Sequence, residues 1–143
     1  MNHHSGAKSV TKAASSVAAS ATHSHEIDTL GFKYASIDVV FSPFTAATSS
    51  YASVLKVQES DASGSGQADV SGLSITAGAG STTGANVGAV ARFNVDLRGR
   101  KRYLTVVTSP GNTVAIVTSA RLSKGEQHAV TASEAGVNNV ASL

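Results

Sequence analysis

Residues 34–42 read YASIDVVFS, and every second side chain from Ala35 to Phe41 is apolar. Successive side chains of an extended strand point to opposite faces, so this alternation directs one apolar face toward a core and the other toward solvent. Residues 90–98 (VARFNVDLR) repeat the pattern, and their inward set is Ala91, Phe93, Val95 and Leu97. A period of two that recurs along the chain predicts a β-protein.

Turn-forming residues divide the rest of the chain into further short strands. We predict strands over residues 51–59, 70–77, 102–108 and 113–122. Gly-, Ser- and Pro-containing segments separate them, and SPGN at residues 109–112 has the composition of a hairpin turn. Short strands at this spacing predict an all-β fold, either an antiparallel β-sandwich or a jelly-roll-like barrel.

The N-terminal residues have a different character. Residues 1–26 are rich in Ala, Ser and Thr, and 13–21 have no apolar stripe to support more than a marginal helix. This composition is typical of disorder. We therefore expect an extended N-terminal arm over residues 1–26 that becomes ordered by lying across a neighbouring subunit, followed by a sandwich domain over residues 27–143.

Composition narrows the class of protein. Charged residues make up 14% of the chain and the formal net charge is +2, far from the strongly basic balance of most nucleic-acid-binding proteins. Cysteine is absent, which excludes disulfides and thiolate metal sites. No segment approaches the roughly 18 apolar residues of a membrane span, and the N-terminus lacks the order of a secretion signal. We expect neither membrane nor direct nucleic-acid contact.

Candidate chemical sites are few. His23, His25 and Glu26 could place two imidazoles and a carboxylate on one side of a strand, although a lone H-x-H motif is more often idle than metal-binding. Glu59, Asp61 and Asp69 bracket a Gly/Ser-rich loop but lack the ligand spacing of a calcium loop, which favours a solvated loop. No nucleophile elbow or phosphate loop is present. We predict a protein without enzymatic activity or cofactor.

The densest charge in the chain lies between two predicted strands. Arg98, Arg100, Lys101 and Arg102 surround Gly99 at what we expect to be a hairpin end. One interpretation is a solvated turn that suppresses edge pairing. The other is a docking point for carboxylates of a partner, which arginine binds bidentately. With Lys8 and Lys12 of the N-terminal segment, these four residues are the candidate partner contacts.

Three short sequence motifs, called phrases from here on, occur in a recognisable order: IDTLGF at residues 27–32, LKVQESD at 55–61 and KRYL at 101–104. In this order they resemble the head decoration or cement proteins encoded near the major capsid protein in tailed-phage genomes. The resemblance spans roughly residues 27 to 108. It implies a β-sandwich module whose phrases lie on or beside strands.

The resemblance also implies a role. Such a protein binds the outer head surface at junctions between capsid subunits and stabilises the expanded shell, with the major capsid protein as partner, the virion as location and a trimer or dimer as the binding form. The alternatives are a tail or neck structural component and a carbohydrate-binding β-sandwich. Sugar sites usually present aromatic platforms, and a chain with no Trp and three Tyr offers few of them.

Overall fold

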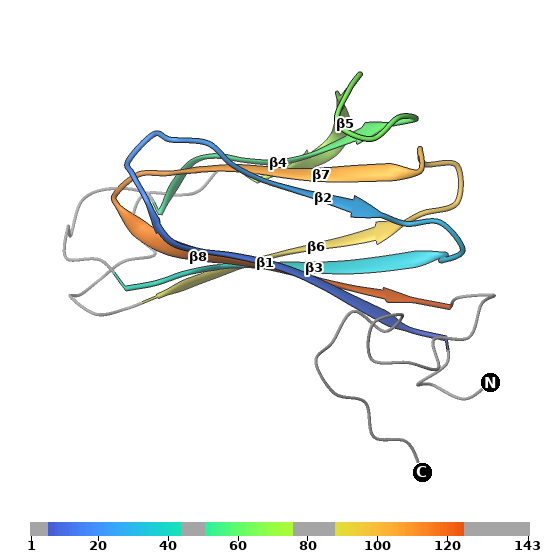
Figure 1. Cartoon of the computed structure of the whole chain (residues 1–143), viewed down its shortest axis with the longest axis horizontal. Helices are drawn as coiled ribbons and strands as arrows, with labels where there is room; N and C mark the ends of the chain where they lie inside the picture. The colour runs from blue at the N-terminus through green and yellow to red at the C-terminus, as the bar shows by residue number, and fades with distance from the viewer. Residues whose placement is uncertain (1–5, 44–50, 76–87, 125–143) are drawn as a thin grey trace, which may run out of the picture.

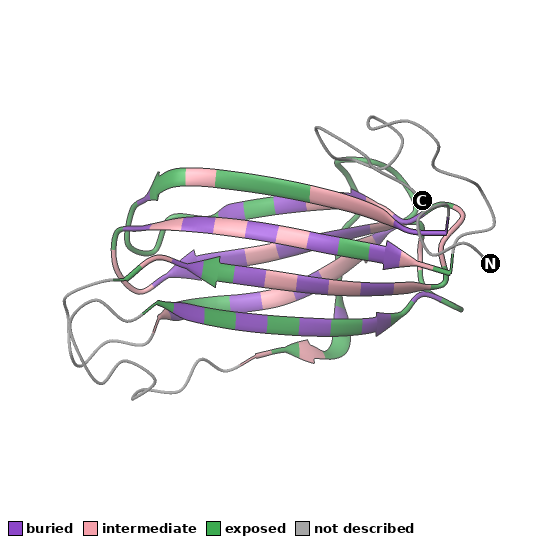
Figure 2. Cartoon of the chain, turned by 90° about the horizontal axis from the view of Figure 1, so that it is seen from below, coloured by how far each residue is buried: buried purple, intermediate pink, exposed green. Residues whose placement is uncertain are grey.

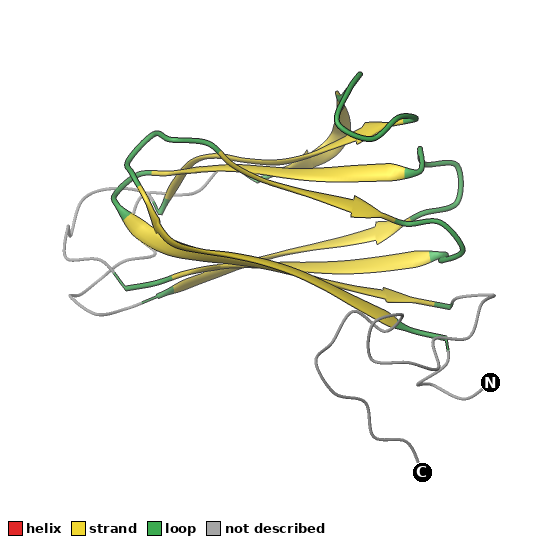
Figure 3. Ribbon diagram, in the orientation of Figure 1, coloured by secondary structure: helices red, strands yellow, loops and turns green. Residues whose placement is uncertain are grey.

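A computed structural model describes residues 6–43, 51–75 and 88–124, and this part of the chain contains strands and no helix (Figures 1 and 3). The strands are β1 (Lys8–Val17), β2 (His23–Asp28), β3 (Tyr34–Phe41), β4 (Ala52–Ser60), β5 (Ala68–Ser74), β6 (Ala89–Asp96), β7 (Tyr103–Pro110) and β8 (Val114–Ser123). All six strands expected after residue 33 are present, although the last two residues of the strand predicted over residues 70–77 lie outside the described part of the chain.

Two four-stranded antiparallel sheets pack face to face. Sheet A has the order β1-β8-β3-β6 and sheet B the order β2-β7-β4-β5. Strands β1 to β4 thus pair with β8, β7, β6 and β5 respectively, as if one long hairpin had been rolled over itself. This is the strand order of a double Greek-key jelly roll. The predicted all-β antiparallel sandwich is confirmed.

The core lies between the sheets and follows the period of two. Along β6 buried and exposed residues alternate without exception, and the banding is visible in Figure 2. The predicted inward sets of β3 and β6 are all buried. Sheet B contributes Leu55, Val57, Leu104 and Val106 to the same cluster. The fold is therefore held by apolar residues that alternate on facing strands.

Two turns expected to be hairpins are instead crossovers. Residues 97–102 connect β6 in sheet A to β7 in sheet B, and residues 111–113 connect β7 back to β8 in sheet A. The hairpin prediction was wrong because turn residues mark a reversal of direction without saying which sheet receives the next strand. Among the described strands only β4 and β5 are neighbours both in sequence and in one sheet.

The prediction that residues 1–26 form an arm apart from the sandwich was also wrong for residues 6–26. Strand β1 pairs with β8 from Lys8↔Leu122 to Val17↔Val114, and β2 pairs with β7 from His23↔Thr108 onward. The N-terminal segment is thus an edge strand of each sheet. Its backbone partners are strands of its own chain. The marginal helix over residues 13–21 is absent, since β1 extends to Val17.

Candidate functional site

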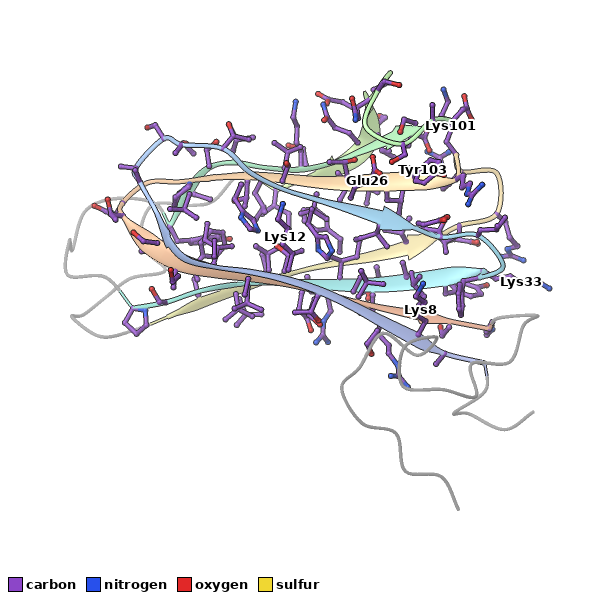
Figure 4. The ribbon with its side chains drawn as sticks, viewed as in Figure 1. Lys8, Lys12, Glu26, Lys33, Lys101 and Tyr103 are labelled. Atoms are coloured by element: carbon purple, nitrogen blue, oxygen red, sulfur yellow. The ribbon has the colours of Figure 1, made fainter. Side chains whose placement is uncertain are left out.

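The three phrases that carry the family resemblance meet at one end of the sandwich. Strands β2, β4 and β6 end there and β7 begins there, on the right in Figure 1. Lys101 and Tyr103 mark this end in Figure 4. We call its ionic side chains the charged end: Asp28, Glu59, Asp61, Asp96, Arg98, Arg100, Lys101 and Arg102.

Asp28 and Arg102 join the end of β2 to the start of β7. Arg102 donates from Nε to Oδ1 at 2.9 Å and from Nη2 to Oδ2 at 2.8 Å, the fork geometry of a bidentate pair. These bonds hold the pKa of the Asp28 carboxyl below its usual range. Thr29 adds a donation from Oγ1 to the Arg102 carbonyl at 2.6 Å. Phrases 27–32 and 101–104 are therefore locked together.

The phrase over residues 55–61 joins the same cluster through two carboxylates. Lys101 donates its backbone N–H to Glu59 Oε2 at 3.1 Å, and the Arg100 guanidinium lies 3.6 Å from Glu59 Oε1. The Lys101 ammonium pairs with Asp61 at 2.8 Å. Because Lys101 contacts both Glu59 and Asp61, the end of β4 is held against the β6–β7 crossover.

Asp96 and Arg98 close the crossover from the side of β6. Arg98 donates from Nη2 to Asp96 Oδ2 at 2.5 Å and from its own backbone N–H to Oδ1 at 3.0 Å. These bonds lower the pKa of the Asp96 carboxyl to about 2. Gly99 follows with a φ of 78°, in the left-handed region that favours glycine. The turn thus separates Arg98 on the sheet A side from Arg100 on the sheet B side.

Each cation of the predicted basic cluster is paired inside the chain. Arg98, Arg100, Lys101 and Arg102 face Asp96, Glu59, Asp61 and Asp28, so the positive charge that stands out in the sequence is neutralised in space. A partner meets a hydrogen-bonding surface with little net charge. The role of these four residues as partner contacts stays a prediction.

An apolar side chain protrudes beside these ion pairs. Leu30 is 60% exposed in the β2–β3 loop. The loop is held in shape because Leu30 donates its backbone N–H to Asp28 Oδ1 at 3.1 Å and Phe32 donates to the Thr29 carbonyl at 3.1 Å. An exposed leucine on a fixed loop, surrounded by paired charges, has the composition of an interface anchor within a polar rim.

The two remaining candidate contacts lie on β1. Lys8 is close enough to the charged end for its charge to help lower the pKa of Asp28. Lys12 lies midway along the strand, and its ammonium donates to the Ser24 carbonyl at 2.7 Å. Figure 4 shows Lys12 between β1 and β2. Lys12 therefore ties the edge strands of the two sheets together, away from the charged end.

His23 and His25 face the interior beside this link. Both are buried, and neither His23 Nε2 nor His25 Nδ1 has a hydrogen-bond partner among the described residues. Burial, assisted by the charges of Lys12 and His23, lowers the pKa of His25 to about 4. The pKa of His23 is lowered by burial and by Lys12. Both imidazoles are thus neutral at pH 7.

Glu26 does not join the histidines. It points to the opposite face of β2, where its carboxylate accepts from Ser63 Oγ at 2.5 Å and from the Gly64 backbone N–H at 2.7 Å. These bonds hold the β4–β5 loop onto sheet B and keep the pKa of Glu26 low. The idea that two imidazoles and this carboxylate share one side of a strand was therefore wrong.

The acidic residues around the β4–β5 loop do not converge either. Glu59 and Asp61 are engaged at the charged end, while Asp69 accepts from Lys56 at 2.9 Å and from Gln58 at 2.7 Å. Within residues 6–43, 51–75 and 88–124, no group of three or more His, Asp or Glu side chains could hold a metal ion.

The sequence did not identify Asp28 and Asp96 as partners of the arginines, nor Leu30 as an exposed apolar side chain. Asp28 and Asp96 each lie two residues before a backbone N–H that their side chains accept, at Leu30 and Arg98. This short-range pattern is a signal that could have identified both as turn residues. Nothing in the sequence indicated which arginine each would meet.

No protein-family model matches the chain, and no curated protein matches it. In the described part of the chain, no helix is long and apolar enough to cross a membrane.

Proposed function

We propose that this chain is a head decoration or cement protein of a tailed phage. It would bind the outer surface of the expanded shell at junctions between capsid subunits. The observation that carries the proposal is the spatial convergence of the three phrases that resemble this family. Segments 27–32, 55–61 and 101–104 are far apart in sequence, yet ion pairs and hydrogen bonds unite them in one surface.

The chemistry of the charged end suits weak contacts repeated many times. Its ion pairs are internally satisfied, so docking against a protein surface does not leave a bare charge buried. Leu30 supplies the apolar area that gains free energy on burial. The weak contacts of many copies on one shell then add up through multivalency. Because the protein would bind only the expanded shell, it would stabilise that state by mass action.

The fold supports the proposal by analogy alone. Jelly rolls occur in viral capsid proteins, and also in lectins and cupins, so this architecture does not by itself define a function. Self-association as a trimer or dimer belongs to the same proposal. Light scattering of the purified protein tests it, and a monomer at all concentrations would contradict it.

Co-sedimentation with expanded capsids that lack the protein tests the main proposal. We expect saturable binding, and we expect Leu30→Ser to weaken it by about tenfold because an anchor side chain loses its apolar contact. Val54→Ser is the matched control, since Val54 is also an exposed apolar residue but lies on β4. A protein that stays in the supernatant with capsids and pellets with tails would favour the tail or neck alternative.

A further inference from the structure

The outer face of sheet A contains a pocket of about 310 Å³ at the edge of the charged end. Tyr34 and Ser36 of β3, Asn94 and Asp96 of β6, and Ser123 of β8 line it with polar groups. Tyr34 is the cross-strand partner of both Asp96 and Ser123, so the three strands present one concave row. This volume is at the small end of the range for ligand pockets, suited to a side chain or a small molecule.

The free hydrogen-bonding groups of the pocket, an amide NH₂ and two hydroxyls, can all donate to a bound oxygen. Ser36 donates from Oγ to Asn94 Oδ1 at 3.0 Å, which occupies the amide oxygen and leaves the Asn94 NH₂ without a partner among the described residues. The hydroxyls of Tyr34 and Ser123 likewise have no hydrogen bond there. Asp96, the one carboxylate in the lining, already accepts from the Arg98 backbone, Nε and Nη2.

Two cations flank the pocket at the Tyr34 ring. The Arg98 guanidinium lies 5.6 Å from the ring centroid and the Lys124 ammonium 4.5 Å from it. These residues follow β6 and β8, the two neighbours of β3, so each neighbouring strand supplies one cation. Arg98 is neutralised by Asp96, whereas Lys124 has no ion pair among the described residues. The uncompensated charge at the pocket is therefore positive.

We infer that this pocket binds a carboxylate, supplied by an acidic side chain on an extended segment of a partner protein. Lys124 provides the charge, and the Asn94 amide with the Tyr34 and Ser123 hydroxyls provides the donors. Charge complementarity selects this ligand, because a cation would meet Lys124 and find the only lining carboxylate already saturated. Placing this segment on a capsid subunit rests on the proposed function, whereas the binding of a carboxylate does not.

Amide NMR of the ¹⁵N-labelled full chain tests the inference directly. The probe is the capped peptide Ac-GEGEG-NH₂, and its matched control is Ac-GQGQG-NH₂, which has nearly the same shape but neutral amides in place of the carboxylates. We expect saturable shifts of the Tyr34, Ser36, Asn94 and Ser123 amides with the Glu peptide. We expect a dissociation constant of about 1 mM, because the polar contacts are solvent-exposed and individually weak. Equal shifts with the Gln peptide, or none with either, would overturn the inference.

Substitutions assign the contact to this pocket. Lys124→Gln should weaken binding of the Glu peptide by about fivefold, and Asn94→Ala by a similar factor. Lys56→Gln removes the same charge from sheet B and should leave the affinity unchanged. The spectra themselves report whether each variant is folded. An unchanged affinity in both pocket variants would overturn the inference.

Free glutarate separates a protein segment from a small-molecule ligand. We expect glutarate to bind at the same amides but more weakly than the peptide, because the peptide backbone adds contacts along the sheet face. Glutarate binding as tight as the peptide would overturn the assignment to a protein segment. A protein that binds the Glu peptide yet does not bind capsids would leave the pocket standing and contradict the proposed function.

Discussion

We predict that His25 makes the stability of the sandwich depend on pH. Its imidazole is buried between the sheets, and its pKa is lowered to about 4 from an ordinary value of 6.5. As the pH falls, the His25 imidazole is therefore protonated near pH 6.5 in the unfolded chain, but only near pH 4 in the native protein. It follows that the stability contributed by a neutral His25 is present above pH 6.5 and is lost as the pH falls through this window.

The size of the loss follows from the two pKa values. One pKa unit corresponds to about 1.36 kcal/mol, so the gap between 6.5 and about 4 corresponds to about 3 kcal/mol. This is a large part of the roughly 5–15 kcal/mol that stabilises a typical domain. His23 acts in the same direction, because burial also lowers its pKa.

Urea unfolding followed by circular dichroism at pH 7, 6, 5 and 4.5 measures this loss. In His25→Val the free energy of unfolding should fall less between pH 7 and 4.5 than in the wild type, by about 2–3 kcal/mol. Carboxylates titrate in both proteins, so their contribution cancels in the difference. Lys12→Met is the matched control: it should keep most of the dependence, because burial lowers the pKa of His25 more than Lys12 does.

Identical pH dependence in the wild type and His25→Val would refute this reasoning. An NMR titration gives a second reading, since the His25 ring signals should titrate near pH 4. Titration at the ordinary value of 6.5 would show that the imidazole reaches solvent and that the β1–β2 edge opens readily.

Three further changes test other parts of the structure. Deleting residues 1–17 removes β1 and leaves β8 as an unpaired edge, so we expect loss of cooperative thermal unfolding in calorimetry. A truncated protein that melts like the full chain would contradict the pairing of β1 with β8. Gly99→Ala should cost about 1 kcal/mol, seen as a lower Tm, because its φ of 78° is strained for alanine although nothing lies within 4 Å of the added Cβ; an unchanged Tm would argue against this backbone conformation. Arg102→Leu should raise the pKa of Asp28 toward its ordinary value and change the Tm little, because the ion pair is exposed to solvent. A carboxyl NMR titration that leaves Asp28 unchanged would show that Arg102 does not pair with it.

The alternation of apolar residues was enough to predict the sandwich. Residues 34–42 and 90–98 lie on strands with one face in the core, and there the pattern can be read directly. Strand β1 could not be predicted in this way. Its inward positions include Lys8 and Lys12, opposite Leu122 and Thr118 of β8, because the edge of a sandwich is open to solvent. An edge strand therefore lacks the pattern that identifies a central one.

The candidate site was predictable only in part. The basic residues stand out because they are adjacent in sequence, but the carboxylates that neutralise them come from other strands. Arg102 meets Asp28 across 74 residues of chain, a contact that depends on β2 and β7 being neighbours in sheet B. Local composition therefore indicated a basic patch, whereas the topology produces a neutral one.

Cryo-electron microscopy of expanded capsids mixed with the purified protein shows directly whether the protein decorates the shell. We predict regular density at subunit junctions, with the charged end and Leu30 directed toward the shell. Bare capsids at saturating protein, or density in which this end points away from the shell, would contradict it.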